Sequence, residues 1–281
     1  MTRPRTLRRA AALVGATALL AGLAACAPAA TEPGAADSEY VTEGKLTIAT
    51  GEPAYYPYVI DDAPESGEGF EAAIAYAVAE ELGFAAEDVV WVRTTFEAAI
   101  QPGPKDFDFN LQQYTITDER AENVDFSSPY YATPQAVITI ESSPAASATS
   151  LADLASLRIG AATGTTSFQV IEEVIAPEAG AQAFNSNDDA KLALESGQID
   201  AIVVDLPTAF YLTGVELTGG VLLGQLPDTA GVSDEWGLVL AKDSPLTDAV
   251  TAAVDALRES GRLAEIAEQW LGADAGAPIL Q

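Results

Sequence analysis

The pattern of apolar and polar residues divides most of the chain into short strands and helices. Leu46 and Ile48 alternate with polar neighbours, as in a strand. The next apolar residues recur at helical spacing, at Phe70, Ile74, Val78 and Leu82. Gly83 follows directly and predicts the end of this helix.

Further apolar runs continue this alternation through the rest of the chain. Strands are predicted at residues 89–92, 107–111, 136–140, 157–161, 199–204 and 236–241. Helices fit between several of them, at about residues 96–101, 166–176, 188–196 and 207–212. Two final helices are predicted from the apolar faces Leu246, Val250, Val254, Leu257 and Leu263, Ile266, Trp270. Strands that alternate with helices indicate an α/β fold with mostly parallel sheets.

Two segments lack this periodicity. Residues 26–43 are rich in Ala, Pro, Glu and Gly, which predicts a flexible tether before the fold. Residues 142–150 are a run of small residues that indicates either a surface loop or a linker between domains, and its shortness favours the loop.

The N-terminus has the features of an export signal. Four arginines precede an apolar stretch over residues 10–25, which is shorter than the roughly 20 apolar residues of a membrane-spanning helix. The stretch ends in Leu-Ala-Ala-Cys26, which resembles a bacterial lipobox, and the resemblance implies cleavage before Cys26 and a lipid on its thiol. Cys26 is the only cysteine, so it has no disulfide partner. A plain secretory signal with an incidental cysteine is the alternative.

The composition narrows the range of partners and of chemistry. The formal net charge is −29, and removal of the signal takes away basic residues only, so we expect neither nucleic acid nor anionic lipid surfaces as partners. Histidine is absent, which excludes serine–histidine and cysteine–histidine nucleophiles and histidine-based metal sites. Catalysis by paired carboxylates stays open. We predict no cofactor and no metal.

A set of motifs carries a family resemblance. The longest covers residues 108–131, DFNLQQYTITDERAENVDFSSPYY. Shorter motifs lie before and after it, in the order expected for the family, at residues 52–58, 69–71, 164–166, 197–205, 236–238 and 261–270. Over residues 45–272 the chain resembles the polar amino-acid family of bacterial solute-binding proteins, the bilobal receptors of ATP-driven importers.

The resemblance implies a type II periplasmic-binding-protein fold, in which two α/β lobes are joined by two crossing strands with the ligand cleft between them. It gives a discontinuous first lobe, residues 44–134 plus 234–272, and a second lobe, residues 135–233. The predicted flanking segments are a signal peptide at 1–25, the tether at 26–43 and a C-terminal tail at 273–281.

A free amino acid needs a cation and donors for its carboxylate, because a charge taken from water is costly unless it is compensated. Arg120 suits this role through its two-pronged guanidinium group, and by resemblance Thr115 adds a hydroxyl donor. A solvated helix charge is the alternative for Arg120. Thr165 and Thr166 begin a helix whose free N–H groups would also bind a carboxylate, although Thr165 can instead act as a simple N-cap.

The ammonium group of the ligand needs an anion. Asp205 ends a predicted strand, where α/β sheets place ligand groups, and by resemblance it is that anion. A purely structural Asp205 is the alternative, and we predict a turn or capping role for Asp200.

By resemblance, the rings of Tyr55 and Phe96 enclose the apolar stem of the ligand, and Glu52 lies near the end of its side chain. Without the family, both rings would be read as core residues. Gln112 and Gln113 depart from the small residues of many relatives and would offer both donors and acceptors. A similar Asn-Gln pair occurs in cystine-binding members, which favours a cystine-like ligand.

These features predict an exported, lipid-anchored and monomeric protein at the outer face of the cell membrane. It would close on a polar amino acid and deliver this ligand to a membrane permease. One alternative is a dehydratase of the same fold that uses Glu52 or Asp205 as an acid. Another is a surface sensor or adhesin without a transport role.

Overall fold

The computed structural model describes residues 39–227, 234–272 and 277–281, which fall in one compact unit. The predicted signal peptide, Cys26 with its lipid, and most of the predicted tether lie outside the described residues. Within the described part of the chain, no helix is both long and apolar enough to cross a membrane.

The first lobe is built on a five-stranded sheet with the order β2-β1-β3-β12-β4. Its strands are β1 (Leu46–Thr50), β2 (Val89–Arg93), β3 (Phe109–Asn110), β4 (Val124–Phe126) and β12 (Val239–Ala241). β1 runs parallel to β2 and β3, whereas β12 runs antiparallel to β3 and β4.

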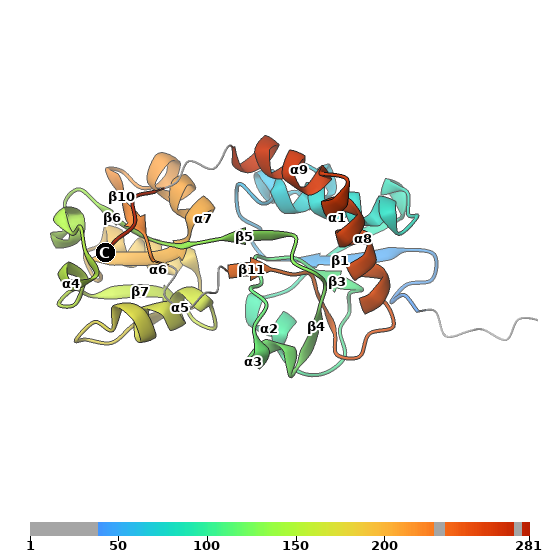
Figure 1. Ribbon diagram of the computed structural model, residues 1–281, viewed down its shortest axis with the longest axis horizontal. Coiled ribbons are helices and arrows are strands. Elements are labelled where there is room, and N and C mark those ends of the chain that lie inside the picture. The colour runs from blue at the N-terminus through green and yellow to red at the C-terminus, as the bar shows by residue number, and fades with distance from the viewer. Residues whose placement is uncertain (1–38, 228–233, 273–276) are drawn as a thin grey trace, which may run out of the picture. The chain divides into compact units, whose positions relative to one another are not determined.

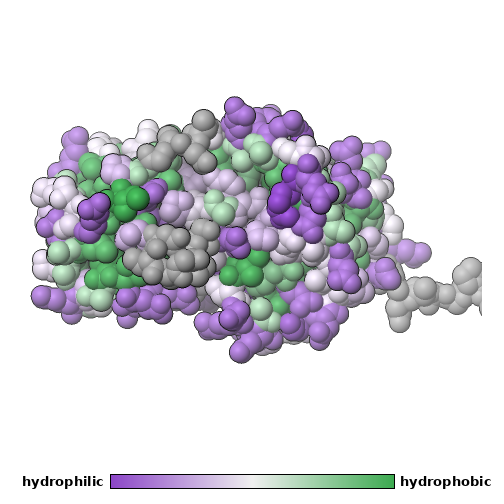
Figure 2. All heavy atoms as spheres, in the orientation of Figure 1, coloured by the Kyte–Doolittle hydropathy of each residue, from purple (hydrophilic) through white to green (hydrophobic). Residues whose placement is uncertain are grey.

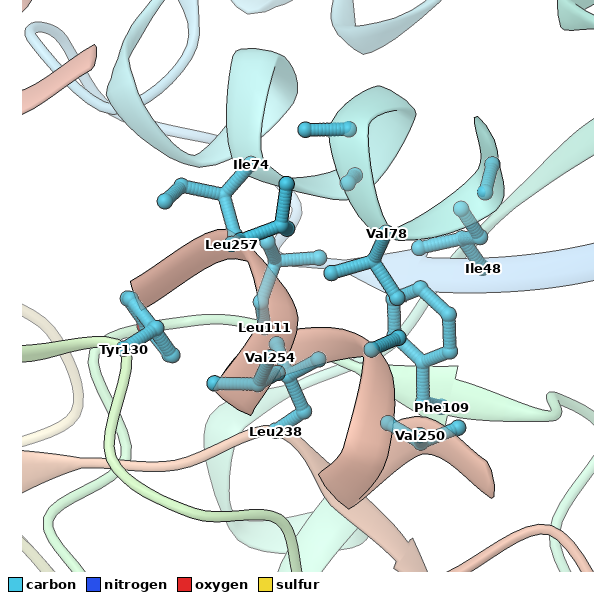
Figure 3. Packing of buried hydrophobic residues seen from close by; sticks show 14 of the residues in the cluster. Ile48, Ile74, Val78, Phe109, Leu111, Tyr130, Leu238, Val250, Val254 and Leu257 are labelled. Carbon is cyan, nitrogen blue, oxygen red and sulfur yellow. The ribbon is translucent and has the colours of Figure 1, made fainter. Parts of the chain in front are cut away.

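Three helices supply most of the helical part of the core of this lobe. They are α1 (Phe70–Glu81), α8 (Thr247–Glu259) and α9 (Arg262–Leu271), and α1 is buried on most of its sides. Figure 3 shows apolar side chains of α1 and α8 pointing toward those of the strands, and the apolar faces predicted from the sequence are the buried ones. Burial of each large aliphatic side chain contributes about 1.5–3 kcal/mol. Two shorter helices, α2 (Phe96–Ile100) and α3 (Asp118–Ala121), complete the lobe.

The second lobe is built on a five-stranded sheet with the order β10-β6-β9-β7-β8. Its strands are β6 (Gln135–Ile140), β7 (Ile159–Ala162), β8 (Gln182–Phe184), β9 (Ala201–Asp205) and β10 (Gly220–Gln225). Its helices are α4 (Leu151–Leu154), α5 (Thr166–Val170), α6 (Asn187–Glu195) and α7 (Leu206–Tyr211), and α5 and α7 each continue into a π-helical turn. Alternate residues of β9 enter two different apolar clusters, as the period of two of a strand requires.

Two short strands join the lobes, as Figure 1 shows. β5 (Tyr131–Thr133) and β11 (Asp234–Trp236) pair with each other in antiparallel fashion, with Asp234 opposite Thr133. The predicted α/β fold with two lobes and two crossing strands is therefore confirmed. The lobe boundaries given by the sequence motifs remain predictions.

The prediction of mostly parallel sheets is wrong, because each sheet contains as many antiparallel as parallel strand pairs. β6 and β12 each follow a crossing strand and run away from the junction of the lobes, whereas β9 and β3 run toward it. A chain that passes between lobes and returns therefore adds antiparallel strands to both sheets.

Other differences are local. The predicted strand at residues 236–241 falls in two strands, β11 and β12, which are separated by Gly237 and Leu238. At Gly237 a Cβ atom would lie 2.9 Å from Ile116 Cδ1. Residues 142–150 contain a 3-10 helix, Pro144–Ser147, whose Ala145 is buried, so this segment packs against the fold as a loop. Figure 2 shows hydrophilic residues along the outer rims of the visible face, with hydrophobic residues among them.

Candidate functional site

A cavity of about 320 Å³ lies between the lobes and is lined by residues of both. Nine of the ten predicted ligand-binding residues line it: Glu52, Tyr55, Phe96, Gln112, Gln113, Arg120, Thr165, Thr166 and Asp205. Thr115 lies beside it, with its hydroxyl 3.4 Å from that of Thr166. A larger hollow of about 520 Å³ has no charged residue in its lining and so cannot compensate a charged ligand.

Arg120 places a buried cation at this cavity. Its side chain is only 8% exposed, so it is not a solvated helix charge. Nη1 donates to the carbonyl of Thr115 at 2.6 Å, Nη2 donates to that of Gly164 at 2.9 Å, and the guanidinium lies 5.4 Å from the centre of the Phe96 ring. None of the ion pairs among the described residues includes Arg120. A buried guanidinium without a carboxylate partner favours an anionic ligand group.

The N-terminus of α5 meets this cation from the second lobe. Gly164 has φ +72°, a left-handed conformation that suits glycine, and the turn leads directly into the helix. The Thr165 hydroxyl accepts from the N–H of Phe168 at 3.2 Å and donates to the carbonyl of Ala162 at 2.6 Å, so Thr165 is the N-cap of α5. Both hydrogen bonds of the Thr165 hydroxyl are thus made within the protein. The first N–H groups of the helix still have no intrahelical partner.

Asp205 places a carboxylate at the same cavity. It precedes α7, yet its side chain makes no capping bond to that helix and instead accepts from Gln135 Nε2 at 2.6 Å. Burial and then the charge of Asp234 raise the pKa of Asp205 to about 8. The hydrogen bond from Gln135 and the charge of Arg120 favour the ionised form but do not outweigh these two effects.

The aromatic residues have mixed surroundings. Phe96 stacks on Tyr114 with 4.5 Å between ring centres, so one of its faces belongs to the core while the residue still lines the cavity. The Tyr55 hydroxyl donates to Asp188 Oδ2 of the second lobe at 3.2 Å. Two neighbouring tyrosines also reach the second lobe, in the contacts Tyr58 with Thr208 (2.8 Å between oxygens) and Tyr56 with Tyr211 (4.6 Å between rings).

The side chains of Gln112 and Gln113 are partly occupied by hydrogen bonds within the protein. Gln113 has φ +53° and is held by Glu71, whose carboxylate accepts from its N–H at 2.8 Å and from its Nε2 at 2.5 Å. Gln112 Oε1 accepts from the Tyr114 hydroxyl at 3.1 Å. Within the described residues, Gln112 Nε2 and Gln113 Oε1 have no such bond, so each side chain retains one polar atom for a ligand.

Glu71 lies behind the cavity and was part of a sequence motif without an assigned role. It also accepts from the Tyr130 hydroxyl at 2.5 Å, and burial raises its pKa to about 7 despite these hydrogen bonds. Asp200 lies at the opposite end of β9 from Asp205 and accepts from the backbone and side chain of Arg158. Its role is therefore an ion pair with Arg158 rather than the predicted turn or cap.

The sequence analysis missed several polar residues of the cavity and of its immediate surroundings. Those that line it are Thr95, Glu97, Thr163, Ser167, Asn185, Ser186 and Asn187. Gln135 and Asp234 lie behind Asp205, and no local motif connects them, because they are far apart in the sequence. Within the described ranges, no three acidic, histidine or cysteine side chains form a group that could hold a metal ion.

Comparison with known proteins shows which family the chain belongs to. Residues 46–273 match the model of the bacterial extracellular solute-binding proteins, family 3. The L-arginine-binding protein of Pseudomonas aeruginosa is 31% identical over 231 residues, which cover 79% of this chain and 86% of that protein.

Two solved structures share the fold at similar identity. An ancestral arginine-binding protein bound to glutamine is 29% identical, with a TM-score of 0.67 and coverage of 83% of this chain and 100% of that one. An ancestral amino acid-binding protein described as a precursor of cyclohexadienyl dehydratase is 28% identical, with a TM-score of 0.65 and coverage of 81% and 95%. The two-lobed fold is thus the type II fold of periplasmic amino-acid-binding proteins, and the chain belongs to the bacterial extracellular solute-binding proteins, family 3.

Proposed function

We propose that this protein binds a polar amino acid in the 320 Å³ cavity and delivers it to the permease of an ABC importer. The observation that carries the proposal is the pair of complementary groups at the cavity, the Arg120 cation without an anionic partner and the carboxyl group of Asp205 without a cationic one. A zwitterion would satisfy both groups at once. The names of the relatives, which bind arginine and glutamine, support the same class of ligand.

The charged residues that line the cavity favour some ligand side chains over others. Once Arg120 and Asp205 are matched to the two ends of an amino acid, the carboxylates of Glu52 and Glu97 remain. They would repel an acidic side chain and attract a cationic or neutral polar one. Arginine, glutamine and histidine are therefore the first ligands to test. A cystine-like ligand stays a prediction that rests on the free amide atoms of Gln112 and Gln113.

The mechanism follows from contacts that come from both lobes. Arg120, Tyr55 and Phe96 belong to the first lobe, whereas Thr165, Thr166 and Asp205 belong to the second. A ligand held by both sets stabilises the closed state over the open one, and the permease would recognise the closed form. The hinge would then lie at the predicted boundaries near residues 134 and 234.

A thermal-shift screen against the common amino acids and cystine tests this function. A ligand at 100 times its dissociation constant adds about 2.7 kcal/mol of stability. We expect one or a few polar amino acids to raise the melting temperature. A response to sugars or metal ions alone would contradict the proposal.

A dehydratase is the second candidate, because burial keeps Asp205 protonated near neutral pH, as a general acid requires. The similarity to a dehydratase precursor gives it some support. Turnover of prephenate or arogenate by the purified protein would favour it over transport.

Attachment to the outer face of the membrane through lipid on Cys26 remains part of the proposal. We expect the wild-type protein to partition with membranes and Cys26→Ser to be released. Recovery of the wild type in the secreted fraction alone would exclude the anchor.

A further inference from the structure

Two carboxylates share one amide group behind the cavity. Gln135 Nε2 donates to Asp205 Oδ1 at 2.6 Å and to Asp234 Oδ2 at 2.5 Å. The other end of the amide, Gln135 Oε1, accepts from the Ser167 hydroxyl at 2.6 Å. Both protons of the amide nitrogen are thus used by the two carboxylates, which lie within about 5 Å of each other across it.

The three residues come from different parts of the chain. Asp205 ends β9 of the second lobe, and Gln135 begins β6 directly opposite it in the ladder. Asp234 begins the crossing strand β11. Gln135 and Asp234 are 5% and 8% exposed, and neither Asp234 nor Gln135 lines the cavity, so Asp205 alone of the three faces a ligand.

The charges around Asp205 do not neutralise this pair. Glu71 opposes its ionisation from the first lobe, while the Arg120 cation favours it from across the cavity. The Tyr58 hydroxyl also lies near Asp205, whose charge and whose surrounding burial raise the pKa of this phenol, so it stays neutral. Among the described residues no ion pair joins either Asp205 or Asp234 to a basic group. Two carboxylates at this separation repel each other, so ionisation of both is unfavourable without a nearby cation.

We propose that Asp205 holds a proton while the cavity is empty, because Asp234 lies on the other side of the Gln135 amide, and that the α-ammonium group of the ligand displaces this proton. Asp234 is then a positioning residue, because it sets the protonation state of Asp205 without touching the ligand. In the binding step the carboxylic acid of Asp205 releases its proton to solvent, and the resulting carboxylate pairs with the ammonium group. The inference rests on the proposed function, since it requires a ligand with an amino group.

Ligand affinity then depends on pH. The pKa of Asp205, raised to about 8 by burial and by Asp234, means that the acid form dominates at neutral pH. Below that value, affinity should fall about tenfold for each unit of pH, because each binding event must remove one proton.

The first experiment needs no ligand. The full chain is labelled with ¹³C at aspartate carboxyl groups and titrated by NMR, and Asp205→Asn identifies the resonance of Asp205. We expect Asp205 to titrate near pH 8 and to titrate at least about one pH unit lower in Asp234→Asn. Titration of wild-type Asp205 below pH 5 overturns the proposal even where the Asp234 variant does not fold, and so does an unchanged titration in a folded variant.

The second experiment measures proton release during binding. Calorimetry with L-arginine at pH 7, in two buffers of different ionisation enthalpy, should show about one proton released by the wild type and none by Asp205→Asn. Binding of arginine without proton release overturns the inference and leaves the proposed function intact. If neither arginine nor any other amino acid of the thermal-shift panel binds, the proposed function fails, and the coupled site as a ligand site fails with it, whatever the titration shows of the carboxylate pair.

Discussion

Arg120 Nη2 donates a hydrogen bond to the carbonyl oxygen of Gly164 at 2.9 Å, and this contact joins a helix of the first lobe to the turn before α5 in the second. The guanidinium thus lies beside the N-terminus of α5, where a ligand carboxylate would meet a cation and backbone donors together. Because this one side chain contacts both lobes, a change in their relative position would alter its hydrogen bonds.

The first prediction concerns this guanidinium. Arg120→Ala should weaken binding of the amino-acid ligand by about 30-fold or more, because the loss of one partner of a buried charge pair costs roughly 2–5 kcal/mol. Arg120→Lys should recover only part of the affinity, since an ammonium group lacks the two-pronged geometry. Isothermal titration calorimetry measures both.

Arg262→Ala is the matched control for the loss of an arginine. Arg262 lies at the start of α9 and pairs with Glu265 on the surface, with about half of its side chain exposed. Affinity should be unchanged in this variant. Wild-type affinity in Arg120→Ala would remove Arg120 from the site.

A second prediction follows from the buried Glu71. Its pKa is about 7 in the folded protein, above the ordinary value of 4.5, so the folded state binds this proton more tightly than the unfolded state. The resulting stability is present in full below pH 4.5 and is lost as the pH rises through 7. The free energy of unfolding should therefore fall between pH 5 and pH 8, by roughly 2–3 kcal/mol from Glu71.

Glu71→Gln removes the titrating proton, because the amide oxygen of a glutamine can still accept from the Gln113 N–H and the Tyr130 hydroxyl, although its NH2 group cannot accept from Gln113 Nε2. Urea unfolding of both proteins at pH 5 and pH 8 provides the comparison. We expect the wild type to lose more stability than the variant over this interval. Equal losses would show that Glu71 does not carry the proton.

The sequence predicted the long helices well, because apolar residues recur at helical spacing over several turns of α1, α8 and α9. It missed β8 and β10, where Gln182–Phe184 is too short for a period and Gly220–Gln225 has no alternation. It also missed β5, which lies between the lobes and, among the described residues, pairs with β11 alone.

The residues of the candidate site also divide into those that the sequence predicted and those that it did not. Arg120 and Asp205 lie within or at the end of recognisable motifs, and the structure brings both to one cavity. Gln135 and Asp234 could not be found, because their hydrogen bonds join positions separated by 70 and 99 residues along the chain. Such contacts exist only after two sheets and two crossing strands have formed.

A third prediction tests the turn before α1. Gly69 has φ +111°, and a Cβ atom there would lie 2.4 Å from the carbonyl oxygen of Tyr58. Gly69→Ala should therefore lower the free energy of unfolding by at least about 3 kcal/mol, from strain and steric overlap together.

Gly197→Ala is the control, because Gly197 also has a positive φ of +74° but has open space around it. It should lower the free energy of unfolding by only about 1–2 kcal/mol, from the left-handed backbone alone. Chemical denaturation of the two variants measures the difference. An equal loss in both would mean that the contact with Tyr58 relaxes without penalty.

The last prediction concerns the end of the chain. α9 packs in the first lobe, yet residues 277–281 lie beside β10 of the second, where the N–H of Leu280 donates to the carbonyl of Gln225 at 2.9 Å. Leu280 is 2% exposed and belongs to an apolar cluster with Leu154 and Leu226, whereas the adjacent Ile279 is 54% exposed. The predicted C-terminal tail therefore contains a core residue of the second lobe.

Leu280→Ala should lower the free energy of unfolding by roughly 2–5 kcal/mol, because it removes buried methyl groups and leaves a cavity in the second lobe. Ile279→Ala removes a side chain of the same size one residue away and should change stability by no more than about 0.5 kcal/mol, because that side chain faces solvent. Urea denaturation of the two variants and the wild type compares them under one condition. Neither residue lines the proposed ligand cavity, so ligand affinity should stay at the wild-type value in any folded variant. If Leu280→Ala is as stable as Ile279→Ala, the last residues do not pack on the second lobe in solution, and the chain crosses between the lobes only at β5 and β11.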